Sequence, residues 1–400
     1  MRVWLALVAI VAVAACSGGG QGSGNTAAPN PITPAPIASP DGGAPADAGA
    51  PADAGNPIFV PPAPDAGTPD AGPTGGGAPP DAGTGFAIAE IPQVVGASGG
   101  TFVPLPAGIN NLGQVVGGFN DCVSVGMSEC NGGPLSGFIF DPVKGTTARI
   151  SASGTENHTA QAINDKGDII LNGNPRGSFD GLVLQNGTVI HLGDEAIVGG
   201  INAEGHVSGT TQTASGAQIA FLWDGKTVNT IGPTGSLGGG LNNAGVVVGS
   251  LHVDATFRAA AFTAAGAQDL GGLPGAQDTF ALAVNQAGRV VGRSFVGTSS
   301  VEHGFVFDLP NGPMVDVTPD GSSELISVNA AGDAVGSRLD RTSSAGSAIL
   351  WHNGAVVDLT TALGDPAWQL LSAAAINDRG QITGFGMHNG KQAAYVLTPK

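Results

Sequence analysis

The sequence predicts an all-β protein, a seven-bladed β-propeller whose last blade is completed by a strand from its N-terminal side. Three observations predict this fold. A short phrase with the pattern Asn-x-x-Gly recurs seven times after residue 86, each copy sits within the same series of short apolar segments, and the two ends of the repeat region carry complementary incomplete units. Repeats of roughly 40 residues that contain four short strands are typical of propeller blades.

The recurring phrase is predicted to form a turn. Asn at the first position and Gly three residues later is the preference of a type I turn, because Gly tolerates a positive φ. Successive copies start 54, 38, 40, 43, 44 and 48 residues apart. The turn residues are Asn110 and Gly113, Asn164 and Gly167, Asn202 and Gly205, Asn242 and Gly245, Asn285 and Gly288, Asn329 and Gly332, and Asn377 and Gly380.

Each repeat contains four strand-like segments. In residues 281–318, "ALAV" precedes the turn and "RVVGRSF" follows it; "GFVFD" and "MVDV" come later, separated by "PNG". β-branched and aromatic residues are frequent in these segments, and none shows the 3.6-residue period of a helix. Trp223 and Trp351 occupy third-segment positions, so we expect them in the core.

The two ends of the repeat region predict that the ring closes. The seventh unit finishes with "AAYVLTPK" and lacks a fourth segment, whereas "FAIAEIP" (86–92) stands alone before the first unit. Pairing of these two segments would close the ring and remove both exposed strand edges. The alternative is a linear solenoid. A solenoid would need capping units at its ends and would not need two half-units that complement each other.

The turns "NDKG" and "NDRG" raise the alternative of calcium binding. A calcium loop needs several oxygen ligands at alternating positions. The turns "NAAG" and "NQAG" contain no acidic residue, so a structural turn explains every copy and calcium explains only two. We therefore expect no metal, and the sequence indicates no cofactor.

The first residues are predicted to be an export signal. One Arg precedes an apolar run from Val3 to Ala15, which is too short to span a bilayer and suits a signal peptide over residues 1–15. "VAAC" resembles a bacterial lipobox, which implies lipid modification of Cys16; ordinary cleavage nearby is the alternative. Several acyl chains anchor a protein firmly, and Ser17 by resemblance favours the outer membrane. We expect a membrane-anchored protein of the cell envelope, at the outer membrane or cell surface.

Residues 16–85 comprise the lipidated N-terminus and a linker. Pro, Ala, Gly and Asp dominate it, as in "PDGGAPADAGAPADAG". Such a segment buries too little apolar surface to offset its ordering entropy. The sequence therefore predicts a disordered tether between the membrane and a propeller over 86–400. A recognition tract is the alternative, although the "DAG" units carry no aromatic or basic anchor.

Cysteine usage and charge limit the partners. Cys122 and Cys130 are predicted to form a disulfide, because an exported chain meets an oxidising compartment. Their spacing is not CxxC and no His lies between them, which argues against a metal site. The net charge is −17 and no Lys/Arg cluster occurs, so a nucleic-acid partner is not expected, since phosphate binding needs a basic face. We expect a monomer.

The units resemble bacterial extracellular HAF repeats, on the segments "AVNQAGRVVGRS", "EHGFVF" and "AQDLGGLPG". The resemblance extends over 86–400 and implies secretion and a repeat domain, but no established activity. Of the seven units, only the one with His303 has the His of the motif, so this position is not a shared ligand. In the other units its place is assigned to Ser136, Asp180, Ile219, Ala260, Ser347 and Ala393.

Loop length gives the best functional indication. First-to-second and third-to-fourth turns are tight and share one face, whereas connections on the other face vary in length. Variable loops on a rigid scaffold commonly carry binding sites, so we expect this second face to bind a protein or a polysaccharide, unless the loops have merely drifted. Its predicted loops are 120–135, 250–258, 294–303, 337–347 and 360–372.

Trp368, within the last of these loops, is the candidate ligand contact, since an indole can stack on a sugar or anchor a protein. The alternative is that it fills space between blades. No nucleophile elbow, HExxH or P-loop motif is present, and Tyr395, the only tyrosine, lies in a predicted strand. We therefore expect binding and not catalysis. The rival is an envelope hydrolase or lyase at the propeller axis, which charged residues at its mouth would favour; a structural spacer is a third possibility.

Overall fold

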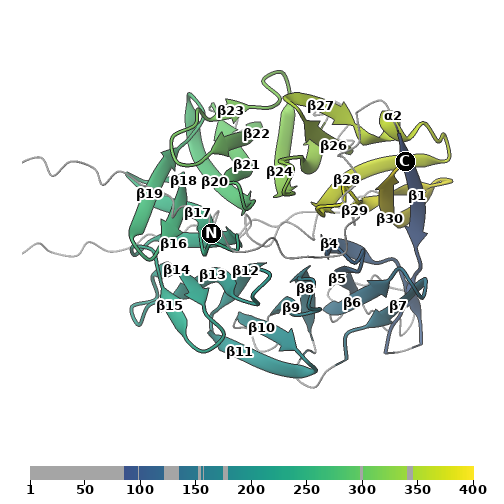
Figure 1. The fold of residues 1–400 in the computed structure, drawn as a ribbon, viewed down its shortest axis with the longest axis horizontal. Helices are drawn as coiled ribbons and strands as arrows, with labels where there is room; N and C mark the ends of the chain where they lie inside the picture. The colour runs from purple at the N-terminus through teal and green to yellow at the C-terminus, as the bar shows by residue number, and fades with distance from the viewer. Residues whose placement is uncertain are drawn as a thin grey trace, which may run out of the picture. The chain divides into compact units, whose positions relative to one another are not determined.

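The computed structural model describes residues 85–97, 99–120, 135–151, 155, 157–173, 179–297, 301–339 and 346–400. All of them belong to the second of two contact units, Pro61–Lys400. Seven four-stranded sheets, each antiparallel, form seven blades. Figure 1 shows the blades arranged around a common centre. The predicted seven-bladed propeller is confirmed.

The first strand of each blade lies nearest the centre (Figure 1). These inner strands are β4 (Leu105–Ile109), β8 (His158–Ile163), β12 (Ile197–Ile201), β16 (Ser236–Leu241), β20 (Ala276–Val284), β24 (Ser322–Val328) and β28 (Trp368–Ile376). The second strands are β5 (Val115–Asn120), β9 (Ile169–Gly173), β13 (Val207–Gln212), β17 (Val247–Val253), β21 (Arg289–Val296), β25 (Ala334–Leu339) and β29 (Ile382–His388).

The third and fourth strands complete the blades. The third strands are β6 (Leu135–Asp141), β10 (Asp180–Gln185), β14 (Gln218–Trp223), β18 (Thr256–Thr263), β22 (Val301–Asp308), β26 (Gly346–His352) and β30 (Lys391–Pro399). The outer strands are β7 (Thr146–Arg149), β11 (Thr188–Asp194), β15 (Val228–Thr230), β19 (Gly266–Gly271), β23 (Val315–Asp316), β27 (Ala355–Asp358) and β1 (Phe86–Ile91). Outside the blades lie a short β2 (Val94–Val95)–β3 (Thr101–Phe102) hairpin and α2 (Leu359–Leu363).

Strand β1 closes the ring as the sequence predicts. It pairs antiparallel with β30, from Phe86 opposite Pro399 to Ile91 opposite Ala394. The last blade therefore takes three strands from the C-terminal end and one from the N-terminal side. This pairing covers the outer edge of β30.

Each Asn-x-x-Gly phrase forms the turn between the inner and second strand of its blade. The Gly N–H donates to the Asn carbonyl oxygen at 3.0 to 3.1 Å in all seven turns, and every one of these glycines has a φ between 73° and 91°. The Asn side chain does more than initiate the turn, because its Oδ1 accepts a backbone N–H four residues later, as in Arg289 N to Asn285 Oδ1 at 2.9 Å.

The same seven asparagines link neighbouring blades into a continuous circle. Each Nδ2 donates to the backbone carbonyl of the corresponding Asn in the next blade, at 2.8 to 3.3 Å. The seven side chains are 3 to 6% exposed. Sequence reasoning identified these residues as turn formers but did not detect this contact between blades.

A second repeated glycine lies seven residues after the Asn, on the second strand. A Cβ at Gly292 would overlap the carbonyl oxygen of Phe280 on the inner strand and crowd the ring of Phe305 on the third strand. Gly117, Gly209, Gly249, Gly336 and Gly384 face an inner-strand carbonyl in the same way. Glycine here leaves room for the inner-strand carbonyl. All seven inner strands show a register shift near this position, including β8, where Leu171 takes the place of the glycine.

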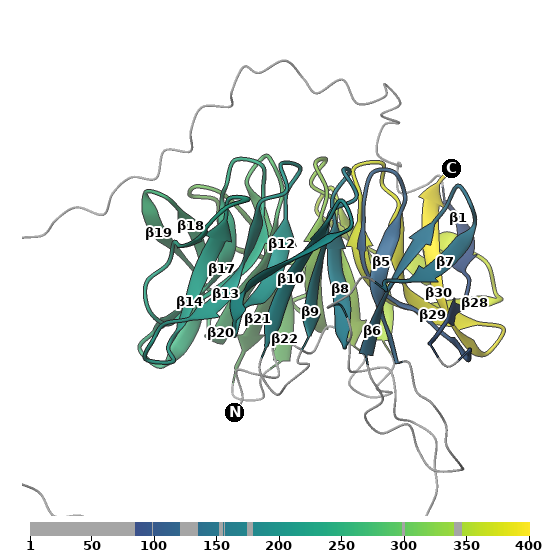
Figure 2. The same ribbon diagram turned by 90° about the horizontal axis from the view of Figure 1, so that it is seen from below.

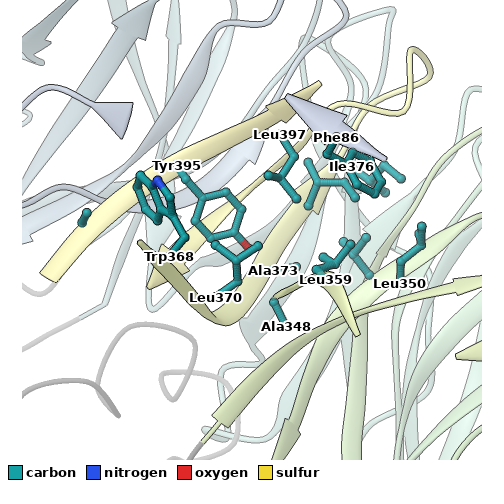
Figure 3. Close-up of a cluster of buried hydrophobic side chains, with 13 residues drawn as sticks. Phe86, Ala348, Leu350, Leu359, Trp368, Leu370, Ala373, Ile376, Tyr395 and Leu397 are labelled. Carbon is teal, nitrogen blue, oxygen red and sulfur yellow. The ribbon is translucent and has the colours of Figure 1, made fainter. Parts of the chain in front are cut away.

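The hydrophobic core is divided into clusters between adjacent blades. Figure 3 shows the one around the closing blade, where Phe86 of β1 meets Leu397 and Ile376. Trp223 and Trp351 are buried at 4% and 8% exposure in other clusters, in agreement with the prediction. Figure 2 shows the blades edge-on, with β30 ending at the upper face.

Candidate binding face

The antiparallel topology gives the propeller two different faces. The Asn-x-x-Gly turns and the third-to-fourth turns lie on one, which we call the turn face. The second-to-third and fourth-to-first connections lie on the other, which we call the variable-loop face. Its described connections include 213–217, 254–255, 272–275, 317–321 and 359–367.

Two of the predicted loops on this face are regular structure. Strand β17 extends to Val253 and strand β18 begins at Thr256. The segment 250–258 is therefore a hairpin with a turn at Asp254 and Ala255, which both have a positive φ. The segment 360–372 contains most of α2 and the start of β28. Predicted loops 294–303 and 337–347 are shortened by longer strands, and their centres, 298–300 and 340–345, lie outside the described residues.

The predicted cysteine sites also lie outside the described part of the chain. Cys16 belongs to the segment before residue 85, and Cys122 and Cys130 to 121–134. Lipid attachment and the disulfide therefore stay predictions.

Trp368, the predicted ligand contact, is instead part of the core. It is 5% exposed and packs beside Leu370 and Tyr395 (Figure 3). The His388 ring stacks on the indole with centroids 4.4 Å apart and an angle of 4°, and His388 Nδ1 is 2.6 Å from Glu90 Oε2 on β1. The indole thus connects three strands of the closing blade. A ligand could not stack on it without displacing His388.

A cavity of about 240 Å³ opens between the blades of β18 and β20, on the variable-loop face. Its walls are the first residues of β18 and the connection that leads from β19 into β20. The lining residues are Thr256, Phe257, Arg258, Gly272, Leu273, Gly275, Ala276, Gln277 and Thr279. Three of these belong to the predicted loop 250–258, but nothing in the sequence singled them out.

The polar wall of the cavity is a cross-strand ion pair. Arg258 Nε lies 3.1 Å from Asp269 Oδ2 on β19, and the two side chains are 47% and 37% exposed. The sequence alone places Ala260, and not Arg258, at the His position of the repeat motif. The strand register corrects this, because Ala260 pairs with Gly249 as Phe305 pairs with Gly292, which puts Arg258 level with His303.

The corrected register explains the motif position itself. His303 Nδ1 lies 2.9 Å from Asp316 on the neighbouring outer strand, as Arg258 lies beside Asp269. In another blade Asp180 at this position meets His191 of β11 at 3.2 Å. In these three blades the position joins the third strand to the fourth through a polar pair, whereas Ile219 and Ala393 hold it in two others.

The aromatic residue at the cavity wall, Phe257, belongs to a series of packed rings. Phe257 stacks on Phe280 with centroids 5.5 Å apart, and Phe280 meets Phe295 edge-on at 6.0 Å. His252 contacts the ring of Phe257 at 5.1 Å. These contacts hold Phe257 in position at the cavity wall.

A buried charge cluster lies behind these rings. The Arg293 side chain is 7% exposed, with Nη1 3.0 Å from Glu324 Oε2 and 3.6 Å from Glu302 Oε1. Burial raises the pKa of Glu302; Arg293 opposes this shift and Glu324 adds to it. The cluster joins β21, β22 and β24 and so links two blades.

Small and apolar residues predominate along the inner strands at the centre of the ring. The residue three positions before each turn Asn carries no charge; these residues are Ala107, Gln161, Gly199, Gly239, Leu282, Ile326 and Ala374. At the turn face, Asp165 and Asp378 accept backbone N–H groups of Asn111 and Ala330 at 2.7 and 2.8 Å. Their carboxylates thus join adjacent turns.

Within the described ranges, no group of three or more His, Cys, Asp or Glu side chains is placed to hold a metal ion. In the same ranges, the helices include none with the length and apolar character needed to cross a membrane.

No known protein family and no curated protein matches the chain, so the resemblance to HAF repeats stays a prediction. Solved structures do match in fold. An acylaminoacyl peptidase in complex with Z-Gly-Gly-Phe-chloromethyl ketone is 12% identical with a TM-score of 0.50, over 74% of this chain and 51% of that one.

Two archaeal structures give similar matches. For an acylaminoacyl peptidase of Pyrococcus horikoshii the identity is 11% and the TM-score 0.48, over 73% of this chain and 52% of the other. The β-propeller domain of the Trilobed protease from Pyrococcus furiosus is 7% identical with a TM-score of 0.49; the match covers 74% of this chain and 95% of that domain. The chain spans about half the length of each of the two acylaminoacyl peptidases. At 12% identity the match with a TM-score of 0.50 shows the fold alone, in agreement with the seven-bladed β-propeller of this chain.

Proposed function

We propose that the protein is a binding module of the bacterial cell envelope, held by an N-terminal lipid, that captures a polysaccharide or protein on its variable-loop face. The observation that carries this proposal is the cavity beside Phe257 and Arg258, on the face predicted to bind. The residue three positions before each turn Asn is uncharged in all seven inner strands, which supports binding over catalysis, because an axial hydrolase or lyase needs acid and base groups near its centre.

The scaffold suits a passive capture role. Seven Asn side chains connect the blades, and the strand β1 closes the ring. A site on such a frame is held in position before the ligand arrives, which reduces the entropic cost of binding.

The test is a retention experiment on the immobilised full chain, with cell-envelope extract and a polysaccharide panel. Ser215→Arg with Asp320→Arg places two bulky charges at exposed positions of the variable-loop face. Ala244→Arg with Ala331→Arg does the same at exposed tips of the turn face and is the matched control. We expect a specific ligand to be lost from the first variant and kept by the second.

Two results would contradict the proposal. Loss of the ligand from the turn-face variant alone would place binding on the wrong face. Absence of any saturable ligand for the unmodified chain would leave the spacer role.

A further inference from the structure

We infer that the cavity between β18 and β20 is a binding site for an uncharged sugar ring of a polysaccharide. This inference rests on the proposed function and names its ligand class. The lining combines an aromatic ring, a guanidinium group, a primary amide and a hydroxyl-bearing residue, from Phe257, Arg258, Gln277 and Thr256. A pyranose presents C–H groups on its faces and hydroxyls around its rim, so it needs both kinds of wall.

The apolar wall is held in position before a ligand binds. Phe280 stacks on Phe257 and His252 contacts its ring, and the Phe257 backbone N–H donates to Asp278 Oδ1 at 2.8 Å across the blade boundary. Aromatic side chains contribute large contact area with few rotatable bonds. The ring can therefore receive the C–H face of a sugar at little ordering cost.

The polar wall can satisfy hydroxyl groups. Asp269 engages Arg258 through Nε, and its Oδ1 accepts the Gly271 N–H at 2.8 Å. The two terminal nitrogens of a guanidinium group are donors in a fixed fork, which suits two adjacent oxygens. The exposed Gln277 amide adds both a donor and an acceptor at the opposite wall.

Charge favours a neutral ligand. Arg258 is the one charged residue among those that line the cavity; Asp269 at 3.1 Å balances its charge, and Asp278 adds a negative charge between the lining residues Gln277 and Thr279. The whole chain has a net charge of −17. A carboxylated or sulfated sugar would meet repulsion from this field, and an uncharged sugar would not.

The cavity volume of about 240 Å³ fits one ring with some water and no extended peptide. A single small ligand of about 12 heavy atoms is expected to bind with a Kd on the order of 1 mM. A polysaccharide immobilised at high density would be retained more strongly through repeated rebinding.

The test uses the full chain and electrophoresis through gels that contain a neutral polysaccharide (dextran, galactan or mannan) or an acidic one (alginate). Titration with the methyl pyranoside of the retained sugar then gives the Kd. Arg258→Ala should weaken binding about 10-fold, because a charge-assisted donor is lost, and Gln277→Ala about 3-fold to 5-fold. Phe257→Leu keeps apolar volume but removes the flat ring and should also weaken binding. Arg379→Ala, an exposed arginine of the turn face, is the matched control and should not change binding.

The outcomes separate this inference from the proposed function. Retention by a neutral polysaccharide that falls in the three cavity variants and not in the control supports it. Equal retention of all variants would overturn the site and leave the binding function standing. Retention by alginate alone, or of an envelope protein alone on the variable-loop face, would overturn the sugar class and again leave the general function. No ligand of any kind would overturn both.

Discussion

Asn377 in the last blade donates from Nδ2 to the backbone carbonyl of Asn110 in the first, at 2.8 Å, across 267 residues of sequence. Asp378 N donates to Asn111 Oδ1 at 2.9 Å beside it. These bonds close the seam between the last and first blades, whereas β1 completes the last blade itself. The ring is therefore closed in two separate places.

The Asn circle predicts a cost for removing any of its members. Asn285→Ala deletes the donor to Asn329 O at 2.9 Å and the acceptor of Arg289 N at 2.9 Å, and leaves both backbone groups in a buried site. We expect the free energy of unfolding to fall by about 1–3 kcal/mol, measured by urea denaturation. Ala287→Ser, in the same turn but exposed, is the control. Equal stability of both variants would show that the circle contributes nothing.

The glycine seven residues after the Asn predicts a steric effect. Gly292→Ala drives a methyl group into the Phe280 carbonyl and the Phe305 ring, so we expect a loss of about 3 kcal/mol or more in unfolding free energy. Gly245→Asn is the comparison, because its φ is 76° but a side chain there meets open space, and Asn tolerates that φ. If Gly292→Ala and Gly245→Asn lowered the unfolding free energy by similar amounts, the loss would come from backbone conformation and not from the overlap with Phe280 and Phe305.

A second set of links between the turns is incomplete and predicts stabilising changes. In five of the seven turns the side chain after the Asn accepts a backbone N–H of the preceding blade; these residues are Asp165, Asn243, Gln286, Asp378 and Asn111. The other two positions are Ala203 and Ala330. Ala203→Asn, which would reach Asp165 N, should add about 0.5–1 kcal/mol.

Thermal unfolding measures this gain, with Ala330→Asn as an independent repeat at Gln286 N. Asp378→Ala, which removes an existing link, should shift the midpoint the other way. A fall in both Asn variants would show that the turns do not accept the added side chain.

The burial of Trp368 predicts a structural phenotype. Trp368→Ala removes a side chain packed against Leu370 and Tyr395 and should cost about 3–5 kcal/mol. His388→Ala uncovers the indole and should cost less. Near-ultraviolet circular dichroism and thermal unfolding report both changes. Retained stability in Trp368→Ala together with loss of ligand would restore the binding role predicted from sequence.

The charge cluster around Arg293 predicts opposite effects for its two acids. Glu324 is the nearer partner of Arg293, so Glu324→Gln should lower stability at pH 7. Burial raises the pKa of Glu302 above 4.5, so its ionised form costs folding energy above that pKa. Glu302→Gln should therefore stabilise the protein at pH 7.

The Glu302→Gln gain should shrink as the pH falls through the raised pKa of Glu302 and disappear below 4.5, where the carboxyl becomes protonated in both the folded and the unfolded state. Denaturation midpoints at several pH values measure this. Destabilisation by Glu302→Gln at pH 7 would mean that its attraction to Arg293 outweighs its burial.

Much of the fold follows from the sequence because its signals are local and repeated. The Asn-x-x-Gly turns fix hairpins, apolar segments alternate with turns, and Phe86–Ile91 has no partner other than an unfinished last blade. The connection made by Asn377 was not predictable, since one-dimensional spacing does not show that a turn Asn reaches a carbonyl of the neighbouring turn.

The site was less predictable than the fold for a physical reason. Its walls come from two adjacent blades, and no motif joins Phe257 to Gln277. Loop length predicts a binding loop over 250–258, but strands β17 and β18 extend through this segment and leave only a two-residue turn at Asp254 and Ala255. Trp368 misled because a large aromatic residue near a loop can be core as easily as surface.

The pairing of β1 with β30 also sets an order of events during synthesis. β1 is the first strand of the propeller to be made, and its partner, residues 391–399, is the last. Until residues 391–399 have been synthesised, β1 has no partner and the final blade cannot be assembled. A chain that stops before residue 391 leaves Phe86–Ile91 without its partner strand, so ring closure requires that residues 391–399 have been made.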